Sequence, residues 1–503
     1  MNGKYILALD EGSSSARAIL VDHDGNIAAD ASQEFDAIFP RPGWVELSPS
    51  VLWEAMHSSI TRAMNSISAT ASDISAVGIT SHRETCLIWD RKTGVPVYNA
   101  IMWMSKQTDE IIRRWSEIGL DHTIKSKTGL RNDSFFSAGK LRWILENVEG
   151  VESMARSGKL ATGTVETWLL WNLTGGQSHV TDRSCASRTS LLNIHEGEWD
   201  LELAEELGVA MELFPSLSDS FGEFGEVAEG ILPGPMTHRI PVSAVLGDQM
   251  AGLFGQVCWN KGDAKNSYGT AGVLTVNVGD EPILLEGMNT SFAWSSDGKF
   301  SYESEGVVFF SGKTIQWLRD NLGVITSAKQ TAEIAASVED NGGVYFVPGF
   351  AGLGDPYWDR NTRGSIMGLQ LDTKKEHIIR AGLESLAYQT MDNFNLLSDT
   401  AFALPSLKVD GGAVNNDWLC QFQADILNVV VERPTEVERT AIGVAQAAGL
   451  AIGLWTENDL KSQWKLDRAF EPKMDSSTRE MLIDGWNDAV KATRSLPPRR
   501  YLS

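Results

Sequence analysis

Cysteine is scarce in this chain, with only four among its 503 residues: Cys86, Cys185, Cys258 and Cys420. They are widely scattered. None forms a Cys-x-x-Cys pair or has His at zinc spacing, which argues against a disulfide scaffold and a zinc motif. We therefore expect reduced thiols. The residues after Met1 enter an expected strand and lack the apolar core of a signal peptide, so we expect a cytoplasmic protein.

Long apolar runs and clusters of positive charge are also missing. The most apolar stretch, residues 442–455, is shorter than the roughly 20 residues that cross a bilayer, so we expect no membrane insertion. Its many Ala and Gly residues favour a helix packed closely against a sheet. Lys and Arg number 43 against 66 Asp and Glu, a net charge of -23. This balance argues against a nucleic-acid partner, which needs clustered Lys and Arg.

The length of the chain predicts two large domains, because single hydrophobic cores stop growing near ~250–300 residues. Hydrophobic residues make up 42% and charged residues 22% of the sequence, as in ordinary globular proteins. A loop rich in Pro and Gly at residues 232–240 lies near the middle of the chain. We place the division just after it, giving an N-terminal domain of residues 1–251 and a C-terminal domain of residues 252–503.

A strand–turn–strand unit occurs twice, about half a chain apart. In the first copy, apolar strands at residues 5–9 and 17–21 flank the turn Asp10-Glu11-Gly12-Ser13-Ser14-Ser15. In the second copy, strands at residues 264–268 and 273–278 flank Gly269-Thr270-Ala271-Gly272. Two such units suggest duplicated domains facing each other, although ordinary hairpins would produce the same pattern.

Apolar residues at helical spacing predict helices between these strands. Strands mixed with helices imply an α/β fold. The expected helices cover residues 51–66, 138–149, 314–321, 377–400 and 416–427.

The first turn combines features of a phosphate site. Glycine and small hydroxyl residues let backbone N–H groups approach an anion closely, and Ser13 and Ser14 add hydroxyl donors. Asp10, at the end of the strand, can hold a metal ion, often through water. The GxxxxGK[ST] phosphate loop is absent from the sequence. Taken alone, a polar hairpin turn is most often only a turn, so the other candidate segments matter.

Three further segments place polar residues at the ends of apolar strands. Gly247-Asp248-Gln249 offers a carboxylate of the kind that phosphoryl transfer to an alcohol requires near the attacking hydroxyl. Residues 408–417 (KVDGGAVNND) join a strand to a helix through paired glycines, which suits a flat adenosine ring or a tight turn equally well. Arg83 and Glu84 can clamp vicinal hydroxyls or form a surface ion pair. Trp103 is either core or the wall of a polyol site.

Taken together, these segments resemble the FGGY carbohydrate kinases, most closely the members that act on glycerol. The resemblance covers nearly the whole chain, in the order ALDEGSSSARAIL, PGWVELSP, GITSHRET, YNAIMW, FFSAGKLRWILEN, GTVETWLLW, VTDRSCASRTSLLNI, GDQMAGLFGQ, KNSYGTAG, IQWLRD, GLGDPYWD and VDGGAVNND. It implies two duplicated α/β domains of the actin-like ATPase (ribonuclease H-like) fold, with the active site in the cleft between them. It also implies ATP-dependent phosphorylation of a small polyol, a Mg²⁺ ion and, by analogy with related enzymes, a homodimer or homotetramer.

The same resemblance implies roles for individual residues. Asp10 would hold Mg²⁺ through water, and Asp248 would be the catalytic base. The residues that would bind ATP are Ser13, Ser14, Arg17, Thr270, Gly312, Gln316, Gly412 and Asn416. The residues that would surround the polyol are Arg83, Glu84, Trp103, Phe135, Asp248, Gln249 and Val273.

Three residues depart from the family pattern. Glu11 replaces a Gln beside the phosphates, Phe135 replaces a Tyr that bonds the substrate, and Val273 replaces a Phe of the pocket wall. The last two changes loosen the fit to glycerol and leave open a four- or five-carbon acceptor such as erythritol, threitol, ribitol or xylitol. A third hypothesis is a non-catalytic, nucleotide-dependent clamp on the same fold, although a clamp needs neither Asp248 nor Arg83.

Overall fold

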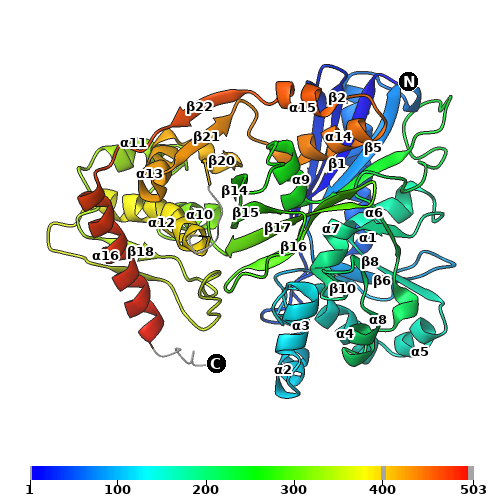
Figure 1. Ribbon diagram of the computed structural model, residues 1–503, viewed down its shortest axis with the longest axis horizontal. Helices are drawn as coiled ribbons and strands as arrows, with labels where there is room; N and C mark the ends of the chain where they lie inside the picture. The colour runs from blue at the N-terminus through cyan, green and yellow to red at the C-terminus, as the bar shows by residue number, and fades with distance from the viewer. Residues whose placement is uncertain (1–2, 398–403, 497–503) are drawn as a thin grey trace.

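The computed structural model describes residues 3–397 and 404–496. The structure contains two large sheets. In Figure 1 the blue N-terminal strands lie on the right, and most of the yellow-to-red segments lie on the left. The first sheet has the order β13-β5-β1-β2-β3. Its strands are β1 (Tyr5–Glu11), β2 (Ser15–Asp22), β3 (Ile27–Glu34), β5 (Ile74–Ser81) and β13 (Val242–Gly247).

The second sheet repeats this arrangement. Its order is β16-β17-β15-β14-β20-β21-β22. Within it, β14 pairs antiparallel with β15 and parallel with β20, as β1 pairs with β2 and β5. This repeated topology confirms the duplicated α/β fold. The strands are β14 (Ala264–Tyr268), β15 (Gly272–Gly279), β16 (Asn289–Ser296), β17 (Lys299–Val308), β20 (Ser406–Asp410), β21 (Val430–Pro434) and β22 (Leu466–Phe470).

Four smaller sheets complete the strand inventory of the described residues. They pair β4 (Glu46–Leu47), β7 (Ala100–Ile101), β6 (Cys86–Asp90) and β8 (Leu160–Thr164); β10 (Leu192–Asn193) and β11 (Glu198–Trp199); β9 (Val180–Asp182) and β12 (Ser216–Ser218); and β18 (Tyr345–Val347) and β19 (Ser365–Met367).

The helices of the N-terminal half are α1 (Pro49–Ser66), α2 (Asp109–Glu117), α3 (Asp121–Thr128), α4 (Ser137–Asn147), α5 (Val151–Arg156), α6 (Val165–Leu173), α7 (Arg183–Ala186), α8 (Leu201–Glu206) and α9 (Asp248–Gly255). Those of the C-terminal half are α10 (Gly312–Asp320), α11 (Gln330–Ala336), α12 (Lys375–Asn395), α13 (Asp417–Leu427), α14 (Arg439–Ala451), α15 (Glu457–Gln463) and α16 (Ser476–Ser495). Part of the helix expected at residues 377–400 lies outside the described residues.

Both faces of β1 are buried, which explains its unbroken apolar sequence. Leu7 and Leu9 pack in one core with α1 and α6. Ile6 and Ala8 point to the other face and pack in a second core with α9 and α14. In the corresponding strand β14, the buried Lys265 donates hydrogen bonds to the side chains of Gln249 and Ser267.

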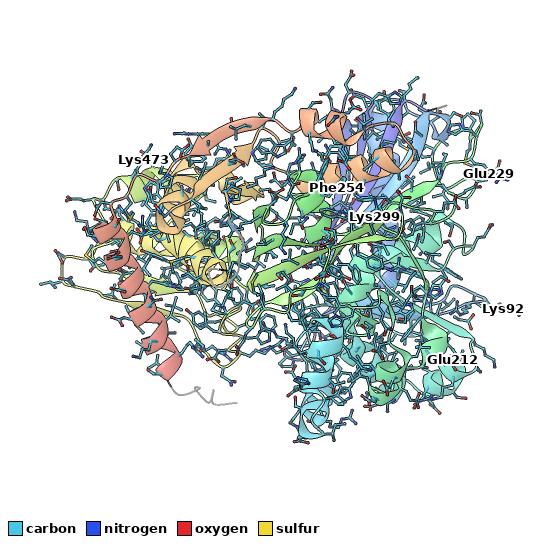
Figure 2. All side chains as sticks on the ribbon, viewed as in Figure 1. Lys92, Glu212, Glu229, Phe254, Lys299 and Lys473 are labelled. Carbon is cyan, nitrogen blue, oxygen red and sulfur yellow. The ribbon has the colours of Figure 1, made fainter. Side chains whose placement is uncertain are left out.

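Helix α14, drawn in orange among the blue strands of Figure 1, packs on β1, β5 and β13 although it comes from the second half of the chain. It also crosses α9, and Phe254 of α9 lies between the two sides of the molecule in Figure 2. This confirms the close helix–sheet packing expected from the Ala- and Gly-rich stretch. The division predicted at Ala251 falls inside α9, so a continuous helix spans it.

Candidate active site

The first turn lies between β1 and β2 and places two predicted phosphate ligands in a cavity. The backbone N–H of Gly12 donates to the carbonyl of Ser15 at 2.8 Å, which closes the turn. Ser13 and Ser14 line a cavity of about 300 Å³. The indole N–H of Trp103 donates to Ser13 Oγ at 2.9 Å, so this turn is tied to the wall of the same cavity.

The second turn, between β14 and β15, is closed by a hydrogen bond from the Gly269 N–H to the Ala271 carbonyl at 3.0 Å. The N–H groups of Ser311 and Gly312 donate to the carbonyls of Thr270 and Gly269, at 3.1 and 2.9 Å. A Cβ at Gly312 would stand 2.7 Å from the Gly269 carbonyl oxygen, so this close approach requires glycine. Thr270 lines two cavities, the one described above and a second of about 700 Å³. The two cavities therefore meet at this turn.

The second cavity contains the predicted nucleotide residues. Gly312, Gln316, Gly412 and Asn416 all line it, together with Thr270. Asn416 also caps α13, because its side-chain oxygen accepts a hydrogen bond from the Leu419 N–H at 3.1 Å. Among the described residues, nothing beyond its chain neighbours lies within 4 Å of where a Cβ of Gly412 would be, so a flat ring can approach the backbone there.

The first cavity contains the predicted polyol residues. Arg83, Glu84, Trp103, Phe135, Asp248, Gln249 and Val273 all line it. Arg83 and Glu84 are only 6% and 2% exposed. This excludes the surface ion pair that the sequence left open. Trp103 packs edge-on against Phe135, with ring centroids 5.4 Å apart, and forms a wall of the cavity.

Asp248 is the first residue of α9, directly after β13. Its Oδ1 lies 3.0 Å from Arg83 Nε. The same oxygen accepts a hydrogen bond from the Gln249 N–H at 2.7 Å. Gln249 is itself held by the fully buried Lys265, whose ammonium donates to the Gln249 amide oxygen at 2.5 Å. The carboxylate and the amide are thus both oriented at the same edge of the cavity.

Asp10 and Arg17 line neither cavity. Burial and the nearby charge of Asp248 raise the pKa of Asp10 to about 7. The guanidinium of Arg17 is already paired with two carboxylates. It pairs with Asp30, with Nε 3.0 Å from Oδ1, and with Glu438 at 3.4 Å. Of these residues, Glu438 lines the first cavity. The phosphate role predicted for Arg17 therefore requires that it exchange these carboxylates for a phosphate.

The residues around Asp10 fit a hydrated Mg²⁺. Within the described part of the chain, no three acidic, His or Cys side chains form a protein-only metal site. Mg²⁺ usually keeps several waters and binds through one or two carboxylates and the substrate phosphates, so a single Asp10 is enough. Burial and the charge of Asp248 disfavour the charged form of Asp10, which a bound cation would stabilise.

Several residues of the two cavities were missed by the sequence interpretation. His82, Asp410 and Glu438 line the first cavity, and the cations Lys313, Arg319 and Lys329 line the second. His82 lies in GITSHRET and Asp410 in residues 408–417, two segments that the sequence did single out without giving these residues a role. The three cations lie on an ordinary amphipathic helix and a loop, where no local pattern distinguishes them from solvent-exposed charges.

Comparison with known proteins agrees with this arrangement. The model of the N-terminal domain of the FGGY family of carbohydrate kinases matches residues 5–255. The model of the C-terminal domain of that family matches residues 264–452. The chain is 48% identical over 497 residues to a glycerol kinase of Carboxydothermus hydrogenoformans, covering 98% of this chain and 99% of that protein. It is 47% identical over 495 residues to a glycerol kinase of Petrotoga mobilis, at 98% and 99% coverage.

Solved structures show the same fold. The crystal structure of Plasmodium falciparum glycerol kinase with ADP matches with a TM-score of 0.91 and 31% identity, covering 98% of this chain and 99% of that one. A gluconate kinase from Lactobacillus acidophilus matches with a TM-score of 0.87, at 98% coverage of both chains and 21% identity. With both family models matched in order and the two cavities meeting at the second turn, the chain belongs to the FGGY family of carbohydrate kinases.

Proposed function

We propose that this kinase transfers the γ-phosphoryl group of ATP to a terminal hydroxyl of glycerol, giving sn-glycerol 3-phosphate and ADP. The observation that carries the proposal is the junction of the two cavities at Gly269 and Thr270. A polyol beside Asp248 and a nucleotide beside Gly412 would meet there. The full-length relatives named glycerol kinase support glycerol as the acceptor.

Arg83 and Glu84 are assigned to the hydroxyls that do not react. A guanidinium donates hydrogen bonds and a carboxylate accepts them, so together they recognise two adjacent hydroxyl groups. Both side chains are nearly fully buried, which makes their orientation well defined. The aromatic rings of Trp103 and Phe135 would contact the carbon backbone of the acceptor.

Asp248 is assigned as the general base. Its carboxylate would take the proton as the O–H bond of the attacking hydroxyl breaks and the new O–P bond forms. The bond between the γ-phosphorus and the bridging oxygen breaks at the same time, and ADP leaves with that oxygen. The apolar walls formed by Phe135, Val273 and Val307 would limit the access of water, which would otherwise hydrolyse ATP.

The phosphates would lie between the two turns, against Ser13, Ser14 and Thr270. When bound, Mg²⁺ neutralises charge on the β- and γ-phosphates, and Asp10 would hold it. Gly312, Gln316, Gly412 and Asn416 would bind the adenosine. Arg17 would complete the phosphate site only after leaving Asp30 or Glu438.

An acceptor screen tests this proposal. ADP release is measured with glycerol, erythritol, threitol, ribitol and xylitol, and kcat/KM is compared. Glycerol is expected to give the highest value. A larger acceptor is the second candidate, because Phe135 and Val273 line the cavity without offering a hydrogen bond. A four- or five-carbon polyol with a higher kcat/KM than glycerol would replace glycerol in the proposal.

The same assay tests the clamp hypothesis. A clamp would hydrolyse ATP at a rate that no polyol changes. A kinase whose active site excludes water releases ADP rapidly only when an acceptor hydroxyl is bound. We expect ADP release to rise at least about 10-fold on adding the preferred polyol, in line with the size of general-base effects.

The cytoplasmic location and the homodimer or homotetramer stay predictions, which cell fractionation and sedimentation equilibrium would test. Among the described residues, every helix is too short or too polar to cross a bilayer.

A further inference from the structure

A network of five charged side chains, four of them buried, lies next to the polyol end of the first cavity and draws on both halves of the chain. It connects Asp248, Arg83, Glu305, Arg188 and Glu84 through a continuous series of ion pairs. Three members line the cavity, but Arg188 and Glu305 do not. These two side chains are fully buried, so they cannot touch a bound polyol without a rearrangement.

Glu305 occupies the centre of this network. It lies on β17, in the C-terminal half, while both of its partners come from the N-terminal half. One carboxylate oxygen lies 2.5 Å from a terminal nitrogen of Arg83. The other accepts a hydrogen bond from Arg188 at 2.7 Å. Each carboxylate oxygen therefore pairs with a different arginine, and no other residue in the network forms ion pairs with both arginines.

Arg188 links Glu305 to the second polyol residue. Its Nε donates to Glu84 at 2.6 Å, and one terminal nitrogen donates to Ser291 Oγ at 3.0 Å. With the bond to Glu305, all three nitrogens of the guanidinium have partners. Its planar fork fixes the direction of each bond, which a lysine could not do. The position of Glu84 thus depends on Arg188, and that of Arg188 on Glu305.

We infer that Glu305 is a positioning residue for the acceptor: through Arg83 and Arg188 it orients the two side chains that bind the polyol hydroxyls. The inference rests on the proposed function, because it takes Arg83 and Glu84 as the polyol ligands. Its physical basis is that two buried guanidinium groups need a carboxylate between them. Without the Glu305 carboxylate, each arginine turns toward another hydrogen-bond acceptor, and the distance between Arg83 and Glu84 changes.

Glu303 provides a matched control. It lies on the same face of β17, is also fully buried, and shares Ser291 as a neighbour. No ion pair within 4 Å joins it to an arginine among the described residues. Burial and the charge of Glu305 raise the pKa of Glu303, whereas Arg188 and Arg83 lower the pKa of Glu305. Glu303→Gln therefore alters a buried carboxyl of the same strand without removing an ion pair to an arginine.

The test compares Glu305→Gln with Glu303→Gln in the full chain. We expect Glu305→Gln to raise the KM for glycerol about 10-fold or more, as the loss of charge-assisted hydrogen bonds does. The KM for ATP should stay within about 3-fold, because the nucleotide cavity is separate from the network. Glu303→Gln should leave both KM values within about 2-fold. An equal rise in both variants, or an unchanged KM for glycerol in Glu305→Gln, would overturn the inference.

Arg188→Lys keeps the test decisive if Glu305→Gln does not fold. Lysine retains the charge but cannot reach Glu84, Ser291 and Glu305 with fixed geometry. A rise of at least about 5-fold in the KM for glycerol, with the ATP value retained, is expected. A folded Arg188→Lys enzyme with an unchanged KM for glycerol would also overturn the inference. If the unmodified enzyme prefers another polyol, the proposed function fails separately, and the same variants are compared with that polyol.

Discussion

Gly443 of α14 lies directly against the backbone of Ala251 in α9, so closely that a Cβ at residue 443 would stand 1.9 Å from the Ala251 carbonyl oxygen. Gly255 of α9 faces the same crossing, where an added Cβ would meet the Cα of Gly443 at 2.9 Å. The two helices therefore touch backbone to backbone. Because α9 begins with Asp248, this contact also sets the position of the proposed base.

Gly443→Ala is expected to lower the free energy of unfolding by about 1–3 kcal/mol, since the helices must move apart to admit a methyl group. Denaturant unfolding measures this. Gly252→Ala in α9 is the matched control, because its Cβ would meet nothing closer than Lys265 at 3.4 Å, an ordinary contact. Equal stability of Gly443→Ala and the unmodified enzyme would show that the helices can separate at no cost.

Asp248→Asn is expected to lower kcat at least about 100-fold, because the amide cannot accept the proton of the attacking hydroxyl. The side chain keeps its size, and its Oδ1 can still accept the Gln249 N–H. Single-turnover ADP formation measures the chemical step, and nucleotide binding is followed separately by calorimetry. Near-normal turnover with normal nucleotide binding would remove Asp248 from the proposed role.

Phe135→Tyr is expected to lower the KM for glycerol by up to about 10-fold. A hydroxyl on this ring would add one hydrogen bond to the acceptor, worth about 0.5–1.5 kcal/mol. The ring lines the cavity and packs against Trp103 and Trp358, so its orientation is held on two sides. Steady-state kinetics measure the change, with the KM for ATP as the internal control. A higher KM for glycerol would contradict this prediction, because it would mean that the new hydroxyl obstructs the acceptor instead of bonding to it.

His179 is expected to make stability depend on pH on the acidic side. Its Nε2–H donates to the Thr162 carbonyl at 2.7 Å, and Arg91 donates to its Nδ1 at 2.9 Å, which requires a neutral ring. Burial and the charge of Arg91 lower its pKa to about 4. The unfolded chain binds a proton near pH 6.5 and the folded chain does not, so stability is present above about pH 6.5 and falls as the pH drops toward 4.

His179 contributes at most about 1.4 kcal/mol per pH unit to the slope of the unfolding free energy against pH. His179→Gln should reduce the loss of unfolding free energy between about pH 7 and pH 5, as measured by urea unfolding. His122→Gln serves as the control, because His122 is exposed in α3. If both variants keep the pH dependence of the unmodified chain, His179 does not titrate in the expected way.

Much of the framework is encoded locally. The apolar residues of β1 and β2 and the small residues between them predict a strand, a turn and a strand, because these choices depend on neighbours in sequence. The same holds for the turn at Gly269 and for the glycine pair that precedes α13. These motifs also indicated the two cavities, because each motif carries its own hydrogen-bonding groups to the end of a strand.

Other features depend on partners that are distant in sequence, and only the tertiary structure decided them. Arg17 is held by Glu438, and Glu305 by Arg188, pairs that are 421 and 117 residues apart. Whether Arg83 forms a surface pair or a buried one depended on which elements pack over it. A local pattern specifies which groups a segment can offer, but the energy of a buried charge depends on the partners that folding brings to it.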